Sequence, residues 1–271
     1  EVHMKEMSAL DFFVENAAEY ITTGNRRVGK GTVVILSSVT GSTVEMVDAV
    51  KKAQADGAKV FGFIDKETAE LAKMVDYCIS YPANEQLKFF MTADCFMKNA
   101  GEFAEYDELY AELDQRLAND LADVEKAADA FGEEFARKHC EDKLHYFVGA
   151  GNQYGATYSY AMCYWEEQHW IRTKSIHSAE FFHGMLEIVD KNTPVTVFMG
   201  EDSQRRLSER VAAFLPKVCS NYEIIDTKNY PMEGISEKFR GHISHLIMHA
   251  VTNRIDAHIE KINCHPMSIR R

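Results

Sequence analysis

The sequence lacks a membrane-spanning run, a secretion signal and a basic surface, and each absence removes a class of protein. Its apolar runs are all shorter than the roughly 18 residues that mark a transmembrane helix. No basic, apolar and small-residue succession opens the chain, so we expect a cytoplasmic protein that does not contact a membrane. The 42 acidic side chains outnumber the 30 basic ones, and the resulting net charge of −12 disfavours nucleic-acid binding.

Recognisable metal and nucleotide motifs are also missing. The six cysteines include no CxxC pair or similar metal-ligand spacing. His245 and His249 lie one helical turn apart, but no Glu or Cys completes a ligand set at helical spacing. The phosphate-loop pattern GxxxxGK[ST] is absent. We therefore expect no metal site and no nucleotide site of that type.

Short strand-like runs alternate with helical patterns along the whole chain. Near-continuous apolar strands separated by helices are typical of parallel sheets covered on both faces, so the sequence predicts an α/β fold. The expected strands are residues 32–38, 59–65 and 77–81 in the first half, and residues 145–149, 175–177, 194–200 and 222–226 in the second half.

A long amphipathic pattern separates the two halves. Over residues 107–138 the apolar positions recur at steps of three and four, with mostly charged residues between them. This pattern predicts a helix that bridges two sheets, or equally one half of a dimer interface. The segment AAEY precedes the strand TVVILSS, and AEFF precedes PVTVFMG, which suggests an internal duplication.

Residues 37–43, with the sequence SSVTGST, follow a predicted strand and open a predicted helix over residues 44–56. Five of these seven residues carry a hydroxyl group, and Gly41 permits a tight turn. Hydroxyls together with the free N–H groups of a helix N-terminus form a phosphate cradle that needs no Lys or Arg. An ordinary N-cap cluster is the alternative, but one or two hydroxyls would suffice for it.

The second half holds a weaker glycine loop and three ionisable candidates. GAGNQY at residues 149–154 is either a tight turn or a ligand contact. The helix expected over residues 154–170 is so apolar that we expect it to be buried on most sides, which would raise the pKa of Glu166 or Glu167 at its end. Alternatively, both carboxylates face solvent. His183, in the segment EFFHG, can transfer protons near neutral pH.

Four segments resemble the sugar isomerase (SIS) domain family in two tandem copies. They are SSVTGSTVE from residue 37, GAGNQY from residue 149, residues 165–184 and the tail NCHPMSIRR from residue 263. Within that family the chain is most similar to the fructoselysine-6-phosphate deglycase group, and it resembles the isomerase half of glucosamine-6-phosphate synthase. The resemblance implies two three-layer αβα subdomains with mostly parallel sheets, at residues 1–105 and 141–271, joined by a long helix at residues 106–140.

The same resemblance implies roles for individual residues. Glu167 would move a proton between carbons 1 and 2 of a phosphorylated sugar, and His183 would assist ring opening in the active site of a homodimer or higher homo-oligomer that shares residues between subunits. No cofactor is implied. The phosphate would be bound by the residues of the hydroxyl loop, Ser37, Ser38, Val39, Thr40, Ser42 and Thr43. Further substrate contacts are expected from Gly151, Gln153, Tyr154 and Glu180.

Two departures distinguish classes within the family. The synthases have a lysine three residues before the catalytic glutamate, where this chain has Tyr164, and no glutaminase domain precedes the first sheet. Both points favour a deglycase over an aminotransferring synthase. A plain aldose–ketose isomerase and a non-catalytic sugar-phosphate sensor remain as alternatives. The family's first strand and GxGxS loop are not found before Val2, and its tail normally continues past Arg271, so we expect both ends to be edges of a larger protein.

Overall fold

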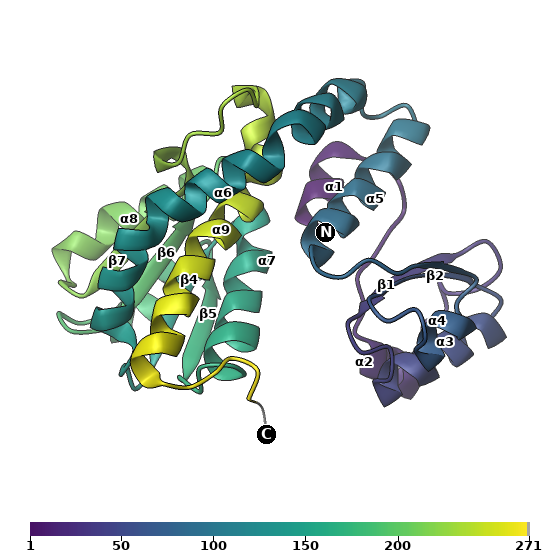
Figure 1. The fold of residues 1–271 in the computed structure, drawn as a ribbon, viewed down its shortest axis with the longest axis horizontal. Helices are drawn as coiled ribbons and strands as arrows, with labels where there is room; N and C mark the ends of the chain where they lie inside the picture. The colour runs from purple at the N-terminus through teal and green to yellow at the C-terminus, as the bar shows by residue number, and fades with distance from the viewer. Residues whose placement is uncertain (270–271) are drawn as a thin grey trace. The chain divides into compact units, whose positions relative to one another are not determined.

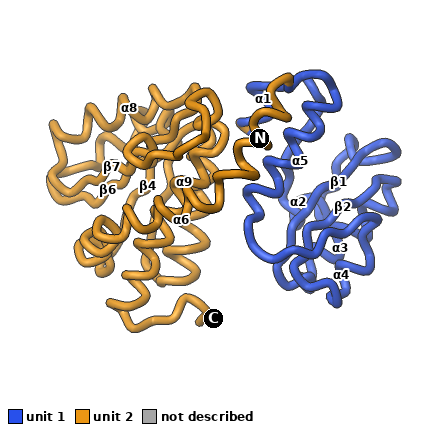
Figure 2. Tube along the Cα trace, turned by 45° about the horizontal axis from the view of Figure 1, so that its top comes forward, with its two compact units in different colours: residues 1, 3–103 blue, residues 2, 104–271 orange. Residues whose placement is uncertain are grey.

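The computed structural model describes residues 1–269, so the basic pair at positions 270–271 lies outside the described residues. The chain divides into two compact units, one formed by residue 1 and residues 3–103, and the other by residue 2 and the chain from residue 104 onward (Figure 2). Among the described residues, no helix is long and apolar enough to cross a membrane.

The first unit is built on a three-stranded parallel sheet with the strand order β1-β2-β3. Strands β1 and β2 are labelled in Figure 1. Its core joins apolar residues of β1 and β2, such as Leu36 and Val60, to Val47 and Val50 of α3. The elements of this unit are α1 (Val2–Met7), α2 (Ala17–Thr23), β1 (Val33–Ser38), α3 (Val44–Ala55), β2 (Lys59–Ile64), α4 (Glu70–Met74), β3 (Tyr77–Ile79) and α5 (Glu85–Asn99).

The second unit is built on a four-stranded parallel sheet with the strand order β5-β4-β6-β7. Its regular helices and strands are α6 (Tyr106–His139), β4 (His145–Gly149), α7 (Asn152–Ser159), β5 (Thr173–His177), β6 (Val195–Met199), α8 (Arg205–Phe214), β7 (Tyr222–Asp226) and α9 (Glu237–Asn263). A π-helix, η1 (Tyr160–Glu166), continues α7, and short 3₁₀ turns are η2 (Phe181–His183), η3 (Met185–Ile188), η4 (Leu215–Lys217) and η5 (Thr227–Asn229).

The strand pattern expected from the sequence is confirmed in both units. All five residues of β6 are buried, as expected for a strand covered on both faces. One side of this sheet packs Val148 and Val197 against Val211 and Leu215. The α/β fold class with parallel sheets is therefore the one that the chain adopts.

The long helix α6 belongs to the second unit, where it lies beside α9 (Figure 1). Arg254 and His258 of α9 both bind Asp129 Oδ1 of α6, the latter at 2.9 Å. A Cβ atom on Gly132 would lie 2.9 Å from the carbonyl carbon of Arg254, so the two helices approach closely at that point. The helix that the sequence places between the domains thus forms a layer of the second one.

Candidate functional site

The hydroxyl loop of the first unit is a tight turn between β1 and α3. Ser38 is buried, and its Oγ accepts a hydrogen bond from the Gly41 N–H at 3.0 Å. Gly41 has a φ of +63°, and a Cβ atom there would lie 2.5 Å from the Cβ of Ala69. Only glycine fits this backbone and this space. Ser38 and Gly41 therefore shape the turn rather than face outward.

The remaining loop residues leave an open helix N-terminus. Val39, Thr40, Ser42 and Thr43 are exposed. Thr43 is the N-cap residue of α3, yet its side chain makes no capping hydrogen bond. Helical N–H groups of the first turn have no partner within the helix and carry a partial positive charge. Thr43 therefore does not cap the helix with its side chain, as the N-cap alternative would require. The exposed hydroxyls of the loop and the N–H groups of the first helical turn can bind an anion.

The glycine loop of the second unit is closed by the chain itself. The Asn152 N–H donates to Asp202 Oδ2 at 2.8 Å, and the Gly151 N–H donates to Gln204 Oε1 at 3.3 Å. Gln153 is fully buried, and its Nε2 donates to Ser244 Oγ at 3.1 Å. A carboxylate of the same unit thus occupies the N-terminus of α7, in contrast to the loop of the first unit.

Tyr154 and Glu180 lie near the carboxyl ends of β4 and β5, the edge where open α/β sheets bind ligands. The ring of Tyr154 meets His177 edge to face, with centroids 4.8 Å apart. Burial, and secondarily the charge of Glu180, raises the pKa of Tyr154. His183 is exposed in the 3₁₀ turn that follows, where its N–H donates to the Glu180 carbonyl at 2.9 Å.

The two adjacent glutamates differ in their contacts. Glu166 Oε1 accepts hydrogen bonds from the Thr173 N–H and from Thr173 Oγ1, at 3.2 and 2.8 Å. Glu167 follows the end of η1, and its N–H donates to the Met162 carbonyl at 3.0 Å. Both glutamate side chains are exposed, as the alternative that they face solvent predicts.

The expectation that the helix after the glycine loop is buried on most sides is wrong. Tyr160 and Trp165 are buried, but Tyr158 is 50% exposed and Met162 is 44% exposed. The sheet and α9 cover only one face of the helix, and tyrosine and methionine tolerate the open face. Among residues 1–269, the apolar surroundings expected for Glu167 are therefore not present.

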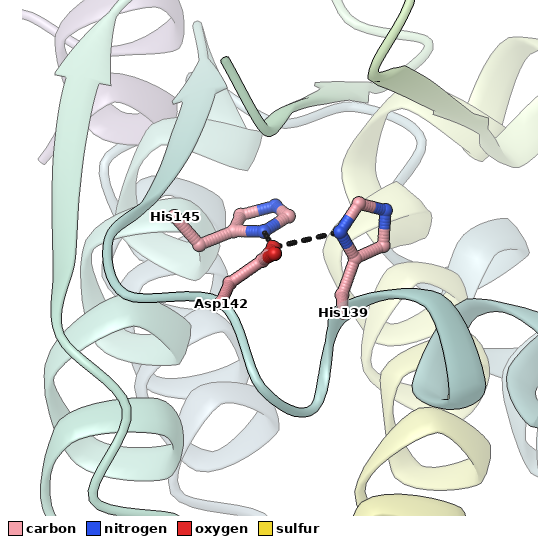
Figure 3. A group of neighbouring side chains, drawn as sticks. All are labelled: His139, Asp142 and His145. Carbon is pink, nitrogen blue, oxygen red and sulfur yellow. Dashed lines mark hydrogen bonds and ion pairs between the residues drawn. The ribbon is translucent and has the colours of Figure 1, made fainter. Parts of the chain in front are cut away.

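A buried histidine pair in the second unit is the one group of potential metal ligands among the described residues (Figure 3). Nδ1 of His139 and Nδ1 of His145 lie 2.7 and 2.8 Å from the same oxygen of Asp142. His145 Nε2 is also engaged, 2.8 Å from Thr196 Oγ1. These are hydrogen-bond distances, and zinc bound at about 2.1 Å would have to displace the three groups. The hydrogen bonds of this group stabilise the turn between α6 and β4.

The histidine pair on Asp142 and the contact of Asp202 with α7 differ in how clearly the sequence indicates them. The spacing His139-x₂-Asp142-x₂-His145 is present in the sequence. It is not recognised as a ligand pattern because it extends across the end of a helix. No local signal indicates that Asp202 fills the N-terminus of α7, because that contact joins residues fifty positions apart.

Comparison with known proteins agrees with this architecture. Fructosamine deglycase FrlB of Bacillus subtilis (strain 168) is 27% identical over 279 residues, covering 98% of this chain and 84% of the relative. Fructoselysine 6-phosphate deglycase of Escherichia coli (strain K12) is 24% identical over 224 residues, covering 81% of this chain and 66% of the relative. The SIS domain model matches residues 1–95.

Solved structures give the same result for the fold. A crystal structure of a candidate phosphosugar isomerase from Bacillus subtilis superposes with a TM-score of 0.89 at 26% identity, covering 94% of this chain and 80% of that one. The C-terminal domain of glucosamine-fructose-6-phosphate aminotransferase from Francisella tularensis has a TM-score of 0.78 at 15% identity, covering 98% and 80% of the two chains.

The parallel sheets define an α/β protein whose fold is shared with the crystal structure of a candidate phosphosugar isomerase. More particularly, the first 95 residues match the SIS domain family, and 98% of the chain aligns with a fructosamine deglycase. The roles of Glu167 and His183, and those of the residues of the two loops, stay predictions.

Proposed function

We propose that this chain is a phosphosugar deglycase that cleaves a 6-phosphorylated fructosamine, such as fructoselysine 6-phosphate, to glucose 6-phosphate and a free amine. The observation that carries the proposal is the similarity to a fructosamine deglycase along 98% of the chain. The hydroxyl loop supports the proposal. The net negative charge of the protein does not attract an anionic substrate, so the substrate must be bound by local hydrogen-bond donors such as those of this loop.

The first part of the mechanism is phosphate binding by the hydroxyl loop. Ser38 and Gly41 hold the turn, so that Thr40, Ser42 and Thr43 present their hydroxyls at the mouth of α3. Binding energy from a phosphate that does not react can orient the reacting carbons of the sugar. Substrates without the phosphate are therefore expected to lose turnover as well as affinity.

The second part is proton transfer by Glu167. The carboxylate removes a proton from carbon 1 of the open-chain fructosamine, giving an enaminol, and a proton returned to carbon 2 gives a Schiff base. Water then adds to carbon 1 and the carbon–nitrogen bond breaks, which releases glucose 6-phosphate and the amine. Glu166 accepts a hydrogen bond from Thr173 Oγ1, and the family resemblance assigns the proton transfer to Glu167, whose carboxylate is exposed.

His183 is assigned to ring opening, for which an exposed imidazole near neutral pH is suited. We propose that the protein works in the cytoplasm as a homodimer or larger homo-oligomer in which subunits share the active site. An open face with exposed Tyr158 and Met162 next to the Glu167 turn supports burial by another subunit.

The alternatives in the same family differ in the reaction that follows phosphate binding. An aldose–ketose isomerase or an aminotransferring synthase would use the same loop and base. A non-catalytic sugar-phosphate sensor would need the loop without Glu167. Tyr164, in the place of the synthase lysine, favours the deglycase.

The test is a substrate panel. The protein is incubated with fructoselysine 6-phosphate, and separately with fructose 6-phosphate plus ammonia or glutamine, and glucose 6-phosphate is measured with a coupled dehydrogenase. We expect glucose 6-phosphate and lysine in equal amounts from the first incubation alone. Glucosamine 6-phosphate from the second incubation would identify a synthase. Binding of both sugars without turnover would identify a sensor.

A further inference from the structure

The segment that carries Glu167 is attached at both ends to a single buried oxygen atom. Tyr160, the first residue of η1, donates its hydroxyl to Asp256 Oδ1 at 2.9 Å. His169, two residues after Glu167, donates its Nε2 to the same oxygen at 3.0 Å. Asp256 belongs to α9, and all three side chains are at most 6% exposed.

The backbone between these two contacts is irregular. The Glu167 N–H donates to Met162 and the His169 N–H to Tyr164, each five residues back, at 3.0 and 2.9 Å. Trp170 then adopts a φ of +59°, which is unusual for a bulky residue. A π-helical turn of this kind is rare and occurs often at functional sites, and it requires tertiary contacts to persist.

Packing alone does not explain a carboxylate at position 256. The second oxygen of Asp256 is buried and has no hydrogen-bond partner in the described structure. Burial raises the pKa of Asp256, against the opposing effects of His169 and Tyr160. An apolar residue of similar size would fill this space without the desolvation cost, so what the carboxylate adds is its two directed contacts.

We propose that Asp256 is a positioning residue that clamps Tyr160 and His169, and thereby fixes the turn that presents Glu167 for proton transfer. The inference rests on the proposed function, since it assigns the clamp to the same base. The clamp fixes the direction of the carboxylate and makes no contact with substrate, so it acts on turnover and leaves substrate affinity unchanged.

The central variant is Tyr160→Phe, which removes one hydroxyl and keeps the buried ring. We expect kcat for a fructosamine 6-phosphate to fall by about ten- to a hundredfold, with KM changed by less than about twofold, because small misplacements of a catalytic group have effects of this size. Amide hydrogen exchange at residues 162–169 is expected to accelerate in the same variant.

A matched control is Tyr20→Phe in the first unit. Tyr20 is 6% exposed and donates its hydroxyl to Asp56 Oδ2 at 2.6 Å, so this variant also loses a tyrosine–carboxylate hydrogen bond. It is expected to lose stability of a similar order and to keep its kcat. A fall in kcat of the same size in Tyr20→Phe would show that the effect is general destabilisation.

A double variant with Glu167→Gln distinguishes a positioning role of the Tyr160–Asp256 contact from a purely structural one. In a Glu167→Gln background, Tyr160→Phe should have no further effect on the residual single-turnover rate. An equal further loss there would overturn the clamp. A normal kcat in Tyr160→Phe, alongside an inactive Glu167→Gln, would also refute the clamp and leave the proposed function intact. Full activity of Glu167→Gln alone would instead refute the base assignment on which the clamp depends.

Discussion

The histidine pair on Asp142 predicts acid-sensitive stability of the second unit. His145 is fully buried, and the resulting desolvation lowers its pKa from 6.5 to about 4, against the opposing effect of Asp142. Burial alone would raise the pKa of Asp142, but the hydrogen bonds from His139 and His145 outweigh it and hold that pKa at about 2. The folded group is therefore a neutral His145 beside an ionised carboxylate at neutral pH.

The direction of the effect follows from proton uptake. Between pH 6.5 and about 4 the imidazole of His145 is protonated in the unfolded chain and neutral in the folded one, so the unfolded state binds more protons. The contribution of His145 to the free energy of unfolding is thus present above pH 6.5 and is lost as the pH falls. At about 1.4 kcal/mol per pH unit, the loss approaches 3 kcal/mol by pH 4. The contribution of Asp142 is lost only below about pH 4.

Tryptophan fluorescence is a selective assay for this effect. The two tryptophans of the chain, Trp165 and Trp170, both lie in the second unit, and Trp165 packs against His145 with ring centroids 4.7 Å apart. Guanidinium unfolding is followed at a series of pH values for the wild type and for His145→Gln, which does not titrate. The expected result is a wild-type dependence of stability on pH that is steeper by up to about 1.4 kcal/mol per unit between pH 4.5 and 6. Equal slopes would refute a buried neutral His145.

Three further substitutions test the loop and the packing. Gly41→Ala places a Cβ atom 2.5 Å from Ala69 at a positive φ, so we expect KM for the phosphosugar to rise at least about tenfold; an unchanged KM would contradict the tight-turn description. Phe147→Ala removes a fully buried ring and should lower the free energy of unfolding by about 3–5 kcal/mol in guanidinium titrations, whereas a loss below about 1 kcal/mol would argue against this core. Gly132→Ala should cost about 1–3 kcal/mol in the same assay by separating α6 from α9, and a neutral result would show that the two helices have room to spare.

The strands were predictable because short apolar runs between helical patterns are visible in the sequence, and β4 and β6 are mostly buried. The runs at residues 145–149 and 222–226 coincide with β4 and β7. The run at residues 194–200 exceeds β6 by one residue at each end. The three-four periodicity over residues 107–138 likewise falls within one residue of α6 at each end. These features depend on local composition and periodicity, which a single sequence contains.

The site was predictable only where its parts are local. The hydroxyl loop could be recognised because a strand, a turn and a helix start are consecutive in the chain. The π-helix at Tyr160 could not be recognised, since apolar residues read alike in α- and π-helical turns. The contacts of Tyr160 and His169 with Asp256 span 96 and 87 positions, and no sequence pattern indicates them.

The exposure of Glu167 shows a further limit of sequence reasoning. An apolar run predicts a buried helix, but it does not say whether one face is covered by the chain itself or by another subunit. Tyr158 and Met162 belong to the face that the chain leaves open. A sequence pattern thus predicts an apolar helix without saying which of its faces the chain covers.

The most direct test of the account compares two isosteric substitutions at neighbouring glutamates. Steady-state release of glucose 6-phosphate from fructoselysine 6-phosphate is measured for Glu167→Gln and Glu166→Gln. The account predicts that the first variant loses about two to four orders of magnitude in kcat while still binding the phosphosugar, and that the second stays within about tenfold of the wild type. Near-wild-type turnover by Glu167→Gln would contradict the assignment of the base, and with it the proposed mechanism.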